Sequence, residues 1–395
     1  MTDVNTEFLD ALIRHQIGLL RVAGSIRKRI LALLDATEAD LKKKIEARLR
    51  NADDTLTPRN VQKMQTLAKI IAKIRAEAWS EVNEALFAEM RDIATNEAQF
   101  LSQAITSISP VVVDVAMPDT ALLKALVTNN PFEGRLLKQW VKDLEREDVR
   151  RINDAIRIGL VQGESNQDIA RRVVGTGAVR GTDGVTELTR SQLTSLSRTA
   201  VNHYANAAKR EFYKKNQDIL NEELFVATLD ARTTPVCRAN DGKTFPVGKG
   251  PIPPLHFNCR STRVPVIDGD ALGQRPAKPF TEAQLVREFS GGKYKNRDQL
   301  PRGQKSKYDA FARKRIRELT GRVPESTSYQ VWLKRQSKTF QNEILGLTRA
   351  RLFRDGGLTL DKFVNRRGDE IPLRELARRE AAAFRAAGLN PEVFK

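Results

Sequence analysis

Both cysteines of the 395-residue chain, Cys237 and Cys259, lie within 23 positions of each other, together with His256, one of three histidines. Sulfur and imidazole nitrogen are ligands that zinc prefers, so these three residues form a candidate metal site. A closed structural zinc site takes four ligands, and the segment supplies three of this kind. Asp230 or Asp241 could add an oxygen ligand. The sequence therefore predicts a cluster that is one soft ligand short of a closed zinc site.

The same residues could support a second chemistry, nucleophilic catalysis by cysteine. A cysteine nucleophile needs a base or a positive field to become a thiolate. His256 could serve Cys237 as the base, and Arg238 and Arg260 could supply the field. The sequence reveals no group that would orient the base and no oxyanion donor, so no residue is predicted to be catalytic. A metal-assisted nuclease or a cysteine-dependent enzyme stays open as an alternative.

The residues around the cluster predict a tight, irregular loop region between two strands. Asp241-Gly242 is a turn signal, and the Pro253-Pro254 pair cannot join a central strand. β-Branched and aromatic residues predict the flanking strands, at 224–229 and 263–267. The residues that we expect to form a structural motif here are Asp230, Arg232, Thr233, Cys237, Asp241, Gly242, His256, Cys259 and Arg260.

The order of these residues resembles that of a known family. Asp230–Gly242 reads Asp-x-Arg-Thr-x-x-x-Cys-x-x-x-Asp-Gly, and Pro254–Arg260 reads Pro-x-His-x-x-Cys-Arg. Both are similar to the phage head morphogenesis family, the minor head proteins that resemble protein F of phage Mu. Ser197-Arg198-Thr199 with Asn202, and the segment 159–170, also look like that family. The resemblance covers roughly residues 130–267.

The resemblance implies a structural protein of a tailed phage and not an enzyme. It implies a minor head protein that acts in head assembly near the portal vertex, with the portal protein and other head proteins as partners. The expected location is the virion, in the head interior or at the portal vertex, after assembly in the host cytoplasm. Segments 332–346 and 358–361 look like the C-terminal extension of many phage minor capsid proteins.

The chain departs from the resemblance at two positions that bear on zinc. Many relatives carry Cys-x-x-Cys before the turn and His-x-x-Cys-x-Cys after it, a spacing that suggests zinc. Thr234 stands where the first cysteine would be, and Ser261 where the last would be. We therefore expect no cofactor, with zinc on Cys237, His256 and Cys259 as the alternative. The loop is then held by packing and by hydrogen bonds from Asp230, Arg232, His256 and Arg260.

Positive charge is concentrated near the C-terminus. The formal net charge is +18, and residues 281–395 carry 26 basic and 14 acidic residues. Such a field favours an acidic partner, and lysine and arginine can neutralise phosphates. No recognition fold is evident, so we expect nonspecific contact with packaged double-stranded DNA. The predicted DNA-binding residues are Lys293, Lys295, Arg297, Lys305, Lys307, Arg313, Lys314, Arg315 and Arg317.

Aromatic residues lie among these cations. Tyr294, Tyr308 and Phe311 could stack on single-stranded bases. The competing interpretation is a solvated helix face whose other side, with Phe311, Ile316 and Leu319, packs inward. Because a helix has two faces, one face could contact nucleic acid while the other packs inward, so the two interpretations are compatible. A nonspecific DNA-binding protein without particle association is a further alternative.

The elements that must position these residues are predicted to be mainly helical. Apolar residues recur at helical spacing from Phe8 to Leu34 and from Met64 to Ile93, and Thr57-Pro58 is a start signal for the second helix. Such stripes pack within a chain more often than they form a coiled coil with another one. A further helix is expected at about 188–216, directly before the first strand.

The predicted fold class is mainly α with a small β element (α+β). It comprises an N-terminal helical arm at 1–109, built as a long hairpin, and a head-morphogenesis-like helical domain at 110–267 with a short sheet around 224–267. A breaker-rich linker at 268–281 and a basic helical C-terminal region at 282–395 follow. No run approaches the roughly 18 apolar residues of a membrane span, and no signal peptide is predicted.

Overall fold

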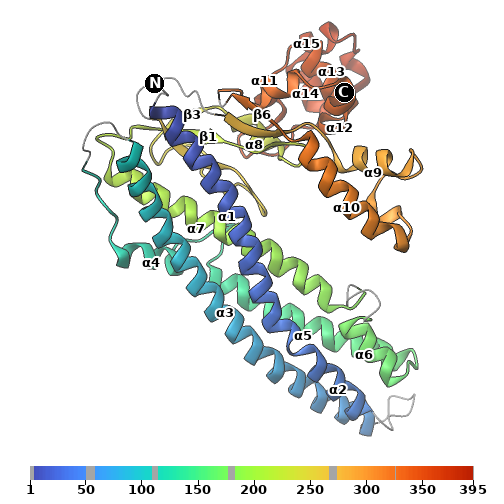
Figure 1. Cartoon of the computed structure of the whole chain (residues 1–395). Helices are drawn as coiled ribbons and strands as arrows, with labels where there is room; N and C mark the ends of the chain where they lie inside the picture. The colour runs from blue at the N-terminus through green and yellow to red at the C-terminus, as the bar shows by residue number, and fades with distance from the viewer. Residues whose placement is uncertain are drawn as a thin grey trace.

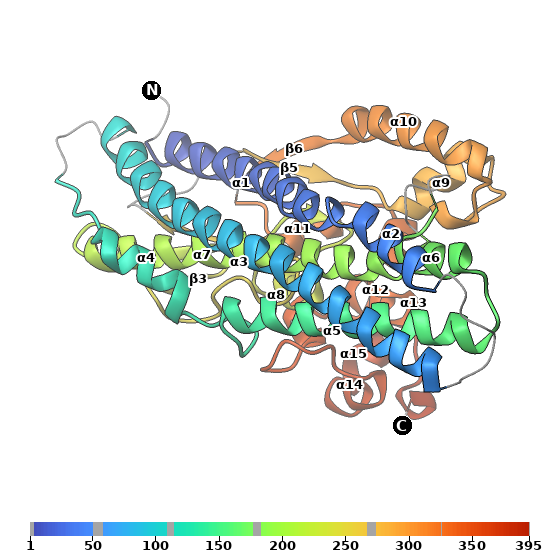
Figure 2. The same ribbon diagram turned by 90° about the horizontal axis from the view of Figure 1, so that it is seen from below.

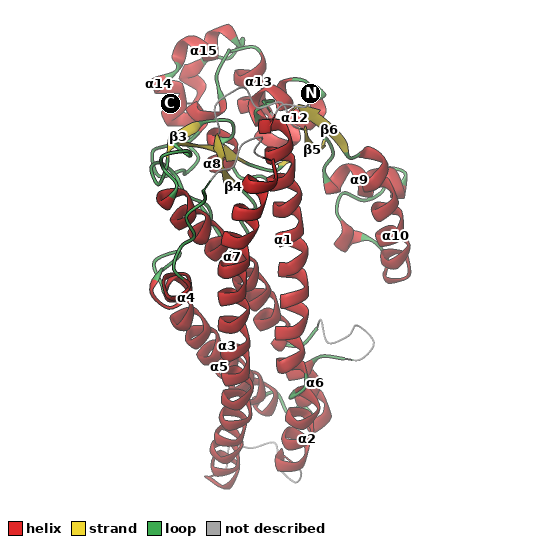
Figure 3. Cartoon of the chain, turned by 60° about the vertical axis from the view of Figure 1, so that its left-hand side comes forward, coloured by secondary structure: helices red, strands yellow, loops and turns green. Residues whose placement is uncertain are grey.

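A computed structural model describes residues 4–49, 58–108, 114–176, 183–266, 274–324 and 326–394. Over this part of the chain the predicted fold class is confirmed, since helices dominate and the strands form two small three-stranded sheets (Figures 1 and 3). No described helix combines the length and the apolar character that a membrane crossing requires.

Long helices lie side by side and form an elongated body below the sheets (Figures 1 and 2). α3 begins at Pro58, as predicted, because proline fits a first helical turn, where the backbone amide has no partner. The predicted helix before the first strand is α7. The helices of this body are α1 (Val4–Asp35), α2 (Glu38–Leu49), α3 (Pro58–Ile108), α4 (Thr120–Asn129), α5 (Leu137–Val161), α6 (Asn166–Val174) and α7 (Thr186–Lys215).

The apolar stripes of α1 and α3 are buried within the chain. Ile26 and Ile30 of α1 and Leu86 of α3 are buried and share one hydrophobic cluster with residues of α5 and α7. Val22, which the predicted stripe included, is 41% exposed, and Ala23 takes the inward position beside it. The prediction of intrachain packing is therefore confirmed, with one residue of the stripe misplaced.

A buried carboxylate fixes how three of these helices meet. Asp148 of α5 accepts hydrogen bonds from Arg75 Nε at 2.6 Å and from Trp79 Nε1 at 3.0 Å, both on α3. Thr189 of α7 donates to its other oxygen at 2.9 Å. A buried charge is tolerated only when it is paired and hydrogen-bonded, so this contact set specifies one register of the helices.

The predicted strand at 224–229 is divided between two sheets. In the first sheet, β1 (Glu222–Val226) lies between β3 (Thr244–Pro246) and β4 (Thr262–Val266), antiparallel to both. In the second sheet, β2 (Leu229–Asp230) pairs parallel with β5 (Gln274–Lys278), and β5 pairs antiparallel with β6 (Gly321–Pro324).

The break falls at Ala227, whose backbone groups are taken by side chains. Its amide donates to Asp241 at 2.6 Å, and its carbonyl accepts a hydrogen bond from Arg275. Because neither group is left for a neighbouring strand, the ladder ends at Val226 and resumes in the other sheet at Leu229.

Part of the predicted linker is regular structure. Residues 268–273 lie outside the described part of the chain, whereas Gln274–Lys278 forms β5. Pro276 is accommodated because β2 pairs only with Ala277 and Lys278, so at Pro276 the strand has a single neighbour, β6. The strand β5 is stabilised by β2 and β6, which are distant in the chain. The local sequence therefore shows no strand pattern.

The C-terminal region has two hydrophobic clusters. One surrounds Tyr308 between α9 and α10, and the other surrounds Trp332 and Phe353 and includes Leu229 of β2 and Ala277 of β5. The C-terminal core therefore extends into the predicted central domain, and the division into domains stays a prediction. The elements are α9 (Glu282–Ser290), η2 (Arg297–Gln299), α10 (Arg302–Leu319), α11 (Tyr329–Lys334), α12 (Lys338–Leu345), α13 (Leu347–Arg354), η3 (Leu360–Phe363), α14 (Leu373–Arg379), α15 (Ala381–Ala386) and η4 (Pro391–Phe394).

Candidate functional site

The cysteines and the histidine of the sequence motif meet in space. Cys237 lies on the short helix α8 (Pro235–Asn240), and His256 and Cys259 lie in the loop that precedes β4. The two sulfur atoms are 3.8 Å apart, and His256 Nε2 is 3.4 Å from Cys237 Sγ. The three potential ligand atoms lie within 4.8 Å of one another. Both cysteines are free thiols and are buried, at 1% and 2% exposure.

The cluster offers three protein ligands, and the nearby carboxylates do not add a fourth. Asp230 is engaged by Arg260, and Asp241 is engaged by Arg275. Three ligands are the number that zinc keeps when its fourth position is left to a water or another molecule, whereas a closed structural site needs four. The residues present therefore fit an open zinc site and do not complete a closed one.

Two hydroxyls occupy the positions where the resemblance would place cysteines. Both Thr234 and Ser261 act on the Cys237 thiol and oppose the rise of its pKa. Thr234 Oγ1 is buried and has no hydrogen-bond partner of good geometry among the described residues. The fold thus directs the side chains at 234, 237, 259 and 261 toward one centre, and in this chain two of the four carry oxygen in place of sulfur.

The proton balance of the cluster favours one thiolate. The hydrogen bond from Cys237, helped by His256, lowers the pKa of Cys259, and that contact together with burial raises the pKa of Cys237. Burial opposes protonation of His256, but the hydrogen bond and charge of Cys259 outweigh it and raise the imidazole pKa. His256 Nε2 also contacts Cys237 Sγ at 3.4 Å. These shifts favour loss of the first proton from Cys259 and retention of the proton on Cys237.

Asp230 closes the loop through Arg260. The guanidinium donates two hydrogen bonds to the carboxylate, at 2.5 and 2.7 Å. Burial would raise the pKa of Asp230, but Arg260 outweighs it and holds that pKa below its ordinary value. The carboxylate also accepts from the Arg232 amide at 3.0 Å and from the Thr233 hydroxyl at 3.2 Å. Four residues of the predicted motif therefore form one hydrogen-bonded unit.

Gly242 is required by its position in the turn. Its φ is +81°, a left-handed conformation that favours glycine, and a Cβ there would lie 2.9 Å from Ser328 Cβ. Asp241 and Gly242 together bring the loop against α11, where Asp241 accepts a hydrogen bond from the Tyr329 amide at 2.6 Å.

Arg238 is held by two backbone carbonyl groups and an aromatic ring. Its guanidinium donates to the carbonyl oxygen of Thr233 at 2.5 Å and to that of Ile344 at 3.2 Å. It also lies over the ring of Tyr329, 5.6 Å from the ring centre. The side chain therefore fastens the loop to the C-terminal region.

Helix α7 holds the other side of the loop. Asn202 donates to the backbone oxygens of Cys259 at 3.0 Å and of Ser261 at 3.2 Å. Thr199 accepts a hydrogen bond from the Asn258 amide at 2.9 Å. These contacts explain why Thr199 and Asn202 accompany the loop motif in the sequence.

A buried polar network behind β4 was not predicted from the sequence. Lys209 Nζ lies 3.2 Å from Glu97 Oε1 and donates to Thr262 Oγ1 at 3.0 Å. Glu97 also contacts His15 Nε2 at 2.8 Å. His15, Glu97 and Lys209 each resemble an ordinary surface residue of their own helix, so only their meeting across α1, α3 and α7 identifies the network.

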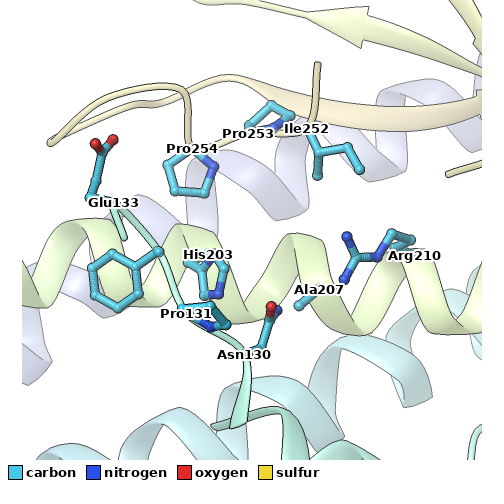
Figure 4. Close-up of a pocket in the computed structure, with 10 residues that line it drawn as sticks. Asn130, Pro131, Glu133, His203, Ala207, Arg210, Ile252, Pro253 and Pro254 are labelled. Atoms are coloured by element: carbon cyan, nitrogen blue, oxygen red, sulfur yellow. The ribbon is translucent and has the colours of Figure 1, made fainter. Parts of the chain in front are cut away.

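His203 lies apart from the cysteine cluster, beside a small cavity of about 230 Å³ (Figure 4). Pro131 and Pro254 lie on either side of it, and Arg210 lines the same cavity. Burial lowers the pKa of His203 to about 4, so the imidazole is neutral at neutral pH.

The predicted DNA-binding residues lie along the segment from Lys293 to Arg317, which includes most of α10. Three of them have acidic neighbours: Arg297 pairs with Asp309, Lys305 lies 3.9 Å from Asp298, and Arg315 pairs with Glu288 and Glu318. The exposed members of the set are Lys293, Lys295, Lys307, Arg313, Lys314 and Arg317.

The predicted role of the aromatic residues among these cations is wrong for Tyr308. This side chain is 3% exposed and packs edge-on against Phe289, at 5.5 Å between ring centres. Phe311, Ile316 and Leu319 are partly buried in the same cluster, as the alternative interpretation predicts. Tyr308 therefore stabilises the pairing of α9 and α10 and is not available to stack on a base.

Comparison with known proteins identifies the central part of the chain. Residues 150–264 match a family described as "Phage Mu protein F like protein". No curated protein and no solved structure matches the chain. The matched segment runs from within α5 to β4 and contains the whole loop motif with its cysteine cluster. Proteins of this family belong to the phage head and act with other head proteins. Residues 150–264 are therefore similar to phage Mu protein F-like proteins, as the resemblance of the loop motif predicts.

Proposed function

We propose that this chain is a structural minor head protein of a tailed phage, which acts in head assembly near the portal vertex and contacts packaged DNA. The family match over residues 150–264 is the observation that carries the proposal. The chemistry of the loop motif supports it. The carboxylates of Asp230 and Asp241 are saturated by arginines and backbone amides, which is typical of groups that stabilise a fold.

A structural role for the cysteine cluster is favoured over catalysis. A nucleophilic cysteine has to be reached by its substrate, and Cys237 and Cys259 are only 1% and 2% exposed, with Cys259 and His256 at the wall of a groove. The thiolate of Cys259 is stabilised by two partners of the same cluster, Cys237 and His256. Such internal stabilisation lowers nucleophilicity, so the cluster is suited to holding α8 against the strand β4.

Contact with DNA is supported by the exposed cations around α10. Between residues 293 and 317 the sequence has ten lysines and arginines and two aspartates, so the segment stays strongly positive after its ion pairs are formed. Each cation that neutralises a phosphate releases counterions, which supplies affinity without sequence specificity. In a head filled with DNA, this segment is the part of the protein that we expect to face the phosphates.

A position near the portal vertex is supported by shape and charge. The long helices extend away from the sheets and provide an arm that can reach a second protein (Figure 1). The net charge of +18 would steer the protein toward an acidic portal surface. Mass spectrometry of purified virions should find the chain in the particle, and it should co-purify with the portal protein at low and at moderate salt.

The DNA contact is tested by the salt dependence of binding. We expect the variant with Lys293, Lys295, Lys307 and Lys314 changed to glutamine to lose about 0.9 from the log–log salt slope for each phosphate contact removed. The matched control changes four exposed lysines of the helical body to glutamine, and it should keep the slope of the original protein: Lys28, Lys124, Lys138 and Lys142. Equal slopes for both variants would refute a DNA contact at α10.

A further inference from the structure

A large groove lies between α1 and the C-terminal half of the protein. Its volume is about 810 Å³, and its walls come from α1, the loop motif, β5 and the end of α10. Figure 2 shows β5 and β6 running beside α1, with α10 beyond them. The volume suits several side chains of a partner and far exceeds a single small anion.

The side chains that line the groove carry positive charge. Arg198, Arg232, Lys278 and Arg317 contribute cationic groups, and no Asp or Glu is among the described residues of the lining. Arg260 and Arg275 also line it, but their charges are balanced by the buried aspartates behind them. The groove therefore has an excess of positive charge that the described protein does not neutralise.

Arg198 and Arg232 line this groove, and Arg27 of α1 is near enough to act on Arg198. Burial lowers the pKa of Arg198 on α7. The like charges of Arg27 on α1 and of Arg232 in the loop motif lower that pKa further. The Nε atom of Arg27 is buried and has no hydrogen-bond partner among the described residues. Arg232 also acts on Asp230, but Arg260 already pairs with that carboxylate, so an anionic group beside the like charges of Arg198 and Arg232 would be favoured.

The wall formed by α1 is apolar. Ile13, Ile17 and Leu20 line the groove at spacings of four and three residues, which places them on one face of the helix. Leu20 is 39% exposed, and Ile316 of α10 lines the groove as well. Apolar side chains in this arrangement are complementary to the apolar face of a second helix.

We propose that this groove binds an acidic amphipathic helix of a partner protein. The leucine-type side chains of that helix would pack on Ile13, Ile17 and Leu20, and the carboxylates of the helix would lie against Arg198 and Arg232. Duplex DNA satisfies only the charged part of this surface, because a phosphate backbone leaves the apolar wall without a partner. The inference rests on the proposed function only in that the partner is expected among the head proteins.

The experiment measures binding of a synthetic helical peptide to the full-length protein by fluorescence anisotropy. The peptide is about 18 residues long, with glutamates on one face and leucines on the other. A scrambled peptide of the same composition tests the helical pattern. The charge variant is Arg198→Glu with Arg232→Glu, and the control with the same change in charge is Lys138→Glu with Lys142→Glu, at exposed positions of α5.

We expect the Arg198→Glu/Arg232→Glu variant to weaken binding of the amphipathic peptide by at least about tenfold, since like charges then face each other. Leu20→Gln should weaken it by at least about threefold. The Lys138→Glu/Lys142→Glu variant should bind like the original protein, and circular dichroism should show that all variants are folded.

Three results would overturn the proposal. The scrambled peptide could bind as well as the patterned one, or both double variants could lose affinity equally, which would indicate diffuse charge. Alternatively, random duplex DNA could displace the peptide while Leu20→Gln has no effect, which would assign the groove to nucleic acid. If the peptide does not bind but the protein is present in virions, only the proposed role of the groove is rejected. If the protein is absent from virions, the proposed function is rejected.

Discussion

Asp241 and Arg275 form a buried ion pair that joins the loop motif to the strand β5. The carboxylate oxygens lie 2.9 and 3.1 Å from the two terminal guanidinium nitrogens, and the side chains are 0% and 4% exposed. The same carboxylate accepts from the amides of Ala227 and Tyr329, both at 2.6 Å. One side chain of the family motif therefore holds the first sheet, the second sheet and α11 together.

Removal of this charge is expected to destabilise the whole protein. Asp241→Asn leaves the Arg275 guanidinium buried without a counter-ion, which should lower the free energy of unfolding by about 3–5 kcal/mol in urea titrations. Asp309→Asn is the matched control, because it breaks the exposed pair with Arg297 and should cost less than about 1 kcal/mol. Similar costs for both variants would contradict the role assigned to Asp241.

Gly242→Ala tests the turn that follows Asp241. The new Cβ would meet Ser328 Cβ at 2.9 Å, and the backbone would keep a φ of +81° that alanine disfavours. We expect a loss of about 1–3 kcal/mol in the free energy of unfolding. Gly303→Ala is the control, since this helical glycine has open space around its Cβ position and should gain up to about 1 kcal/mol. A neutral Gly242→Ala variant would show that the turn can relax.

The loop motif was accessible to sequence analysis because its residues are close in the chain. Asp230, Arg232 and Thr233 form a turn, and the return of the chain brings Arg260 to the same carboxylate. Cysteines and histidines are rare in this sequence, so the sequence alone also indicates that Cys237 lies near His256 and Cys259. Local spacing and unusual residue types carried this information.

The partners that the motif uses over long distances were not predictable. Arg275 lies in a stretch with prolines, glycines and no alternation, and its strand forms only when β2 and β6 are in place. Tyr329 donates from α11, 88 positions beyond Asp241. Neither residue carries a local signal, because an ion pair or amide contact leaves no periodic pattern in the sequence.

Restoring the two missing sulfur atoms should convert the cysteine cluster into a closed zinc site. Thr234 and Ser261 act directly on the Cys237 thiol, so Thr234→Cys with Ser261→Cys places four sulfur atoms and His256 around one centre. Zinc binds strongly to such ligands and stabilises the state that holds them. We expect one zinc per chain by mass spectrometry under native conditions, and a melting temperature that rises with zinc.

The original protein provides the comparison for this prediction. With three soft ligands, its zinc should be weaker and removable by a chelator without loss of structure. A second variant, which adds Cys259→Ser to the two cysteine substitutions, should lose most of the gain because a central ligand is absent. Identical zinc content in all three proteins would contradict the convergence of these side chains.

His203 predicts an acid-sensitive step in stability. Burial lowers its pKa to about 4 in the folded protein, from an ordinary value of 6.5. The unfolded chain therefore binds a proton at a pH where the folded protein does not. Stability from this residue is complete above pH 6.5 and is lost as the pH falls from 6.5 to 4, by about 3 kcal/mol over that interval.

The contribution of His203 is isolated by a substitution that keeps the ring and removes the titrating nitrogen. His203→Phe retains an aromatic ring beside Phe132 and Tyr204, whose ring centres lie 5.0 and 4.8 Å away. Because carboxylates titrate equally in both proteins, the difference in unfolding free energy between them should change by about 3 kcal/mol from pH 7.5 to pH 4, in favour of the variant. Glu133→Gln changes a charge at the same cavity and should leave the acid sensitivity in place. If His203→Phe kept the full acid sensitivity of the original protein, the proton uptake would have to be assigned to other groups.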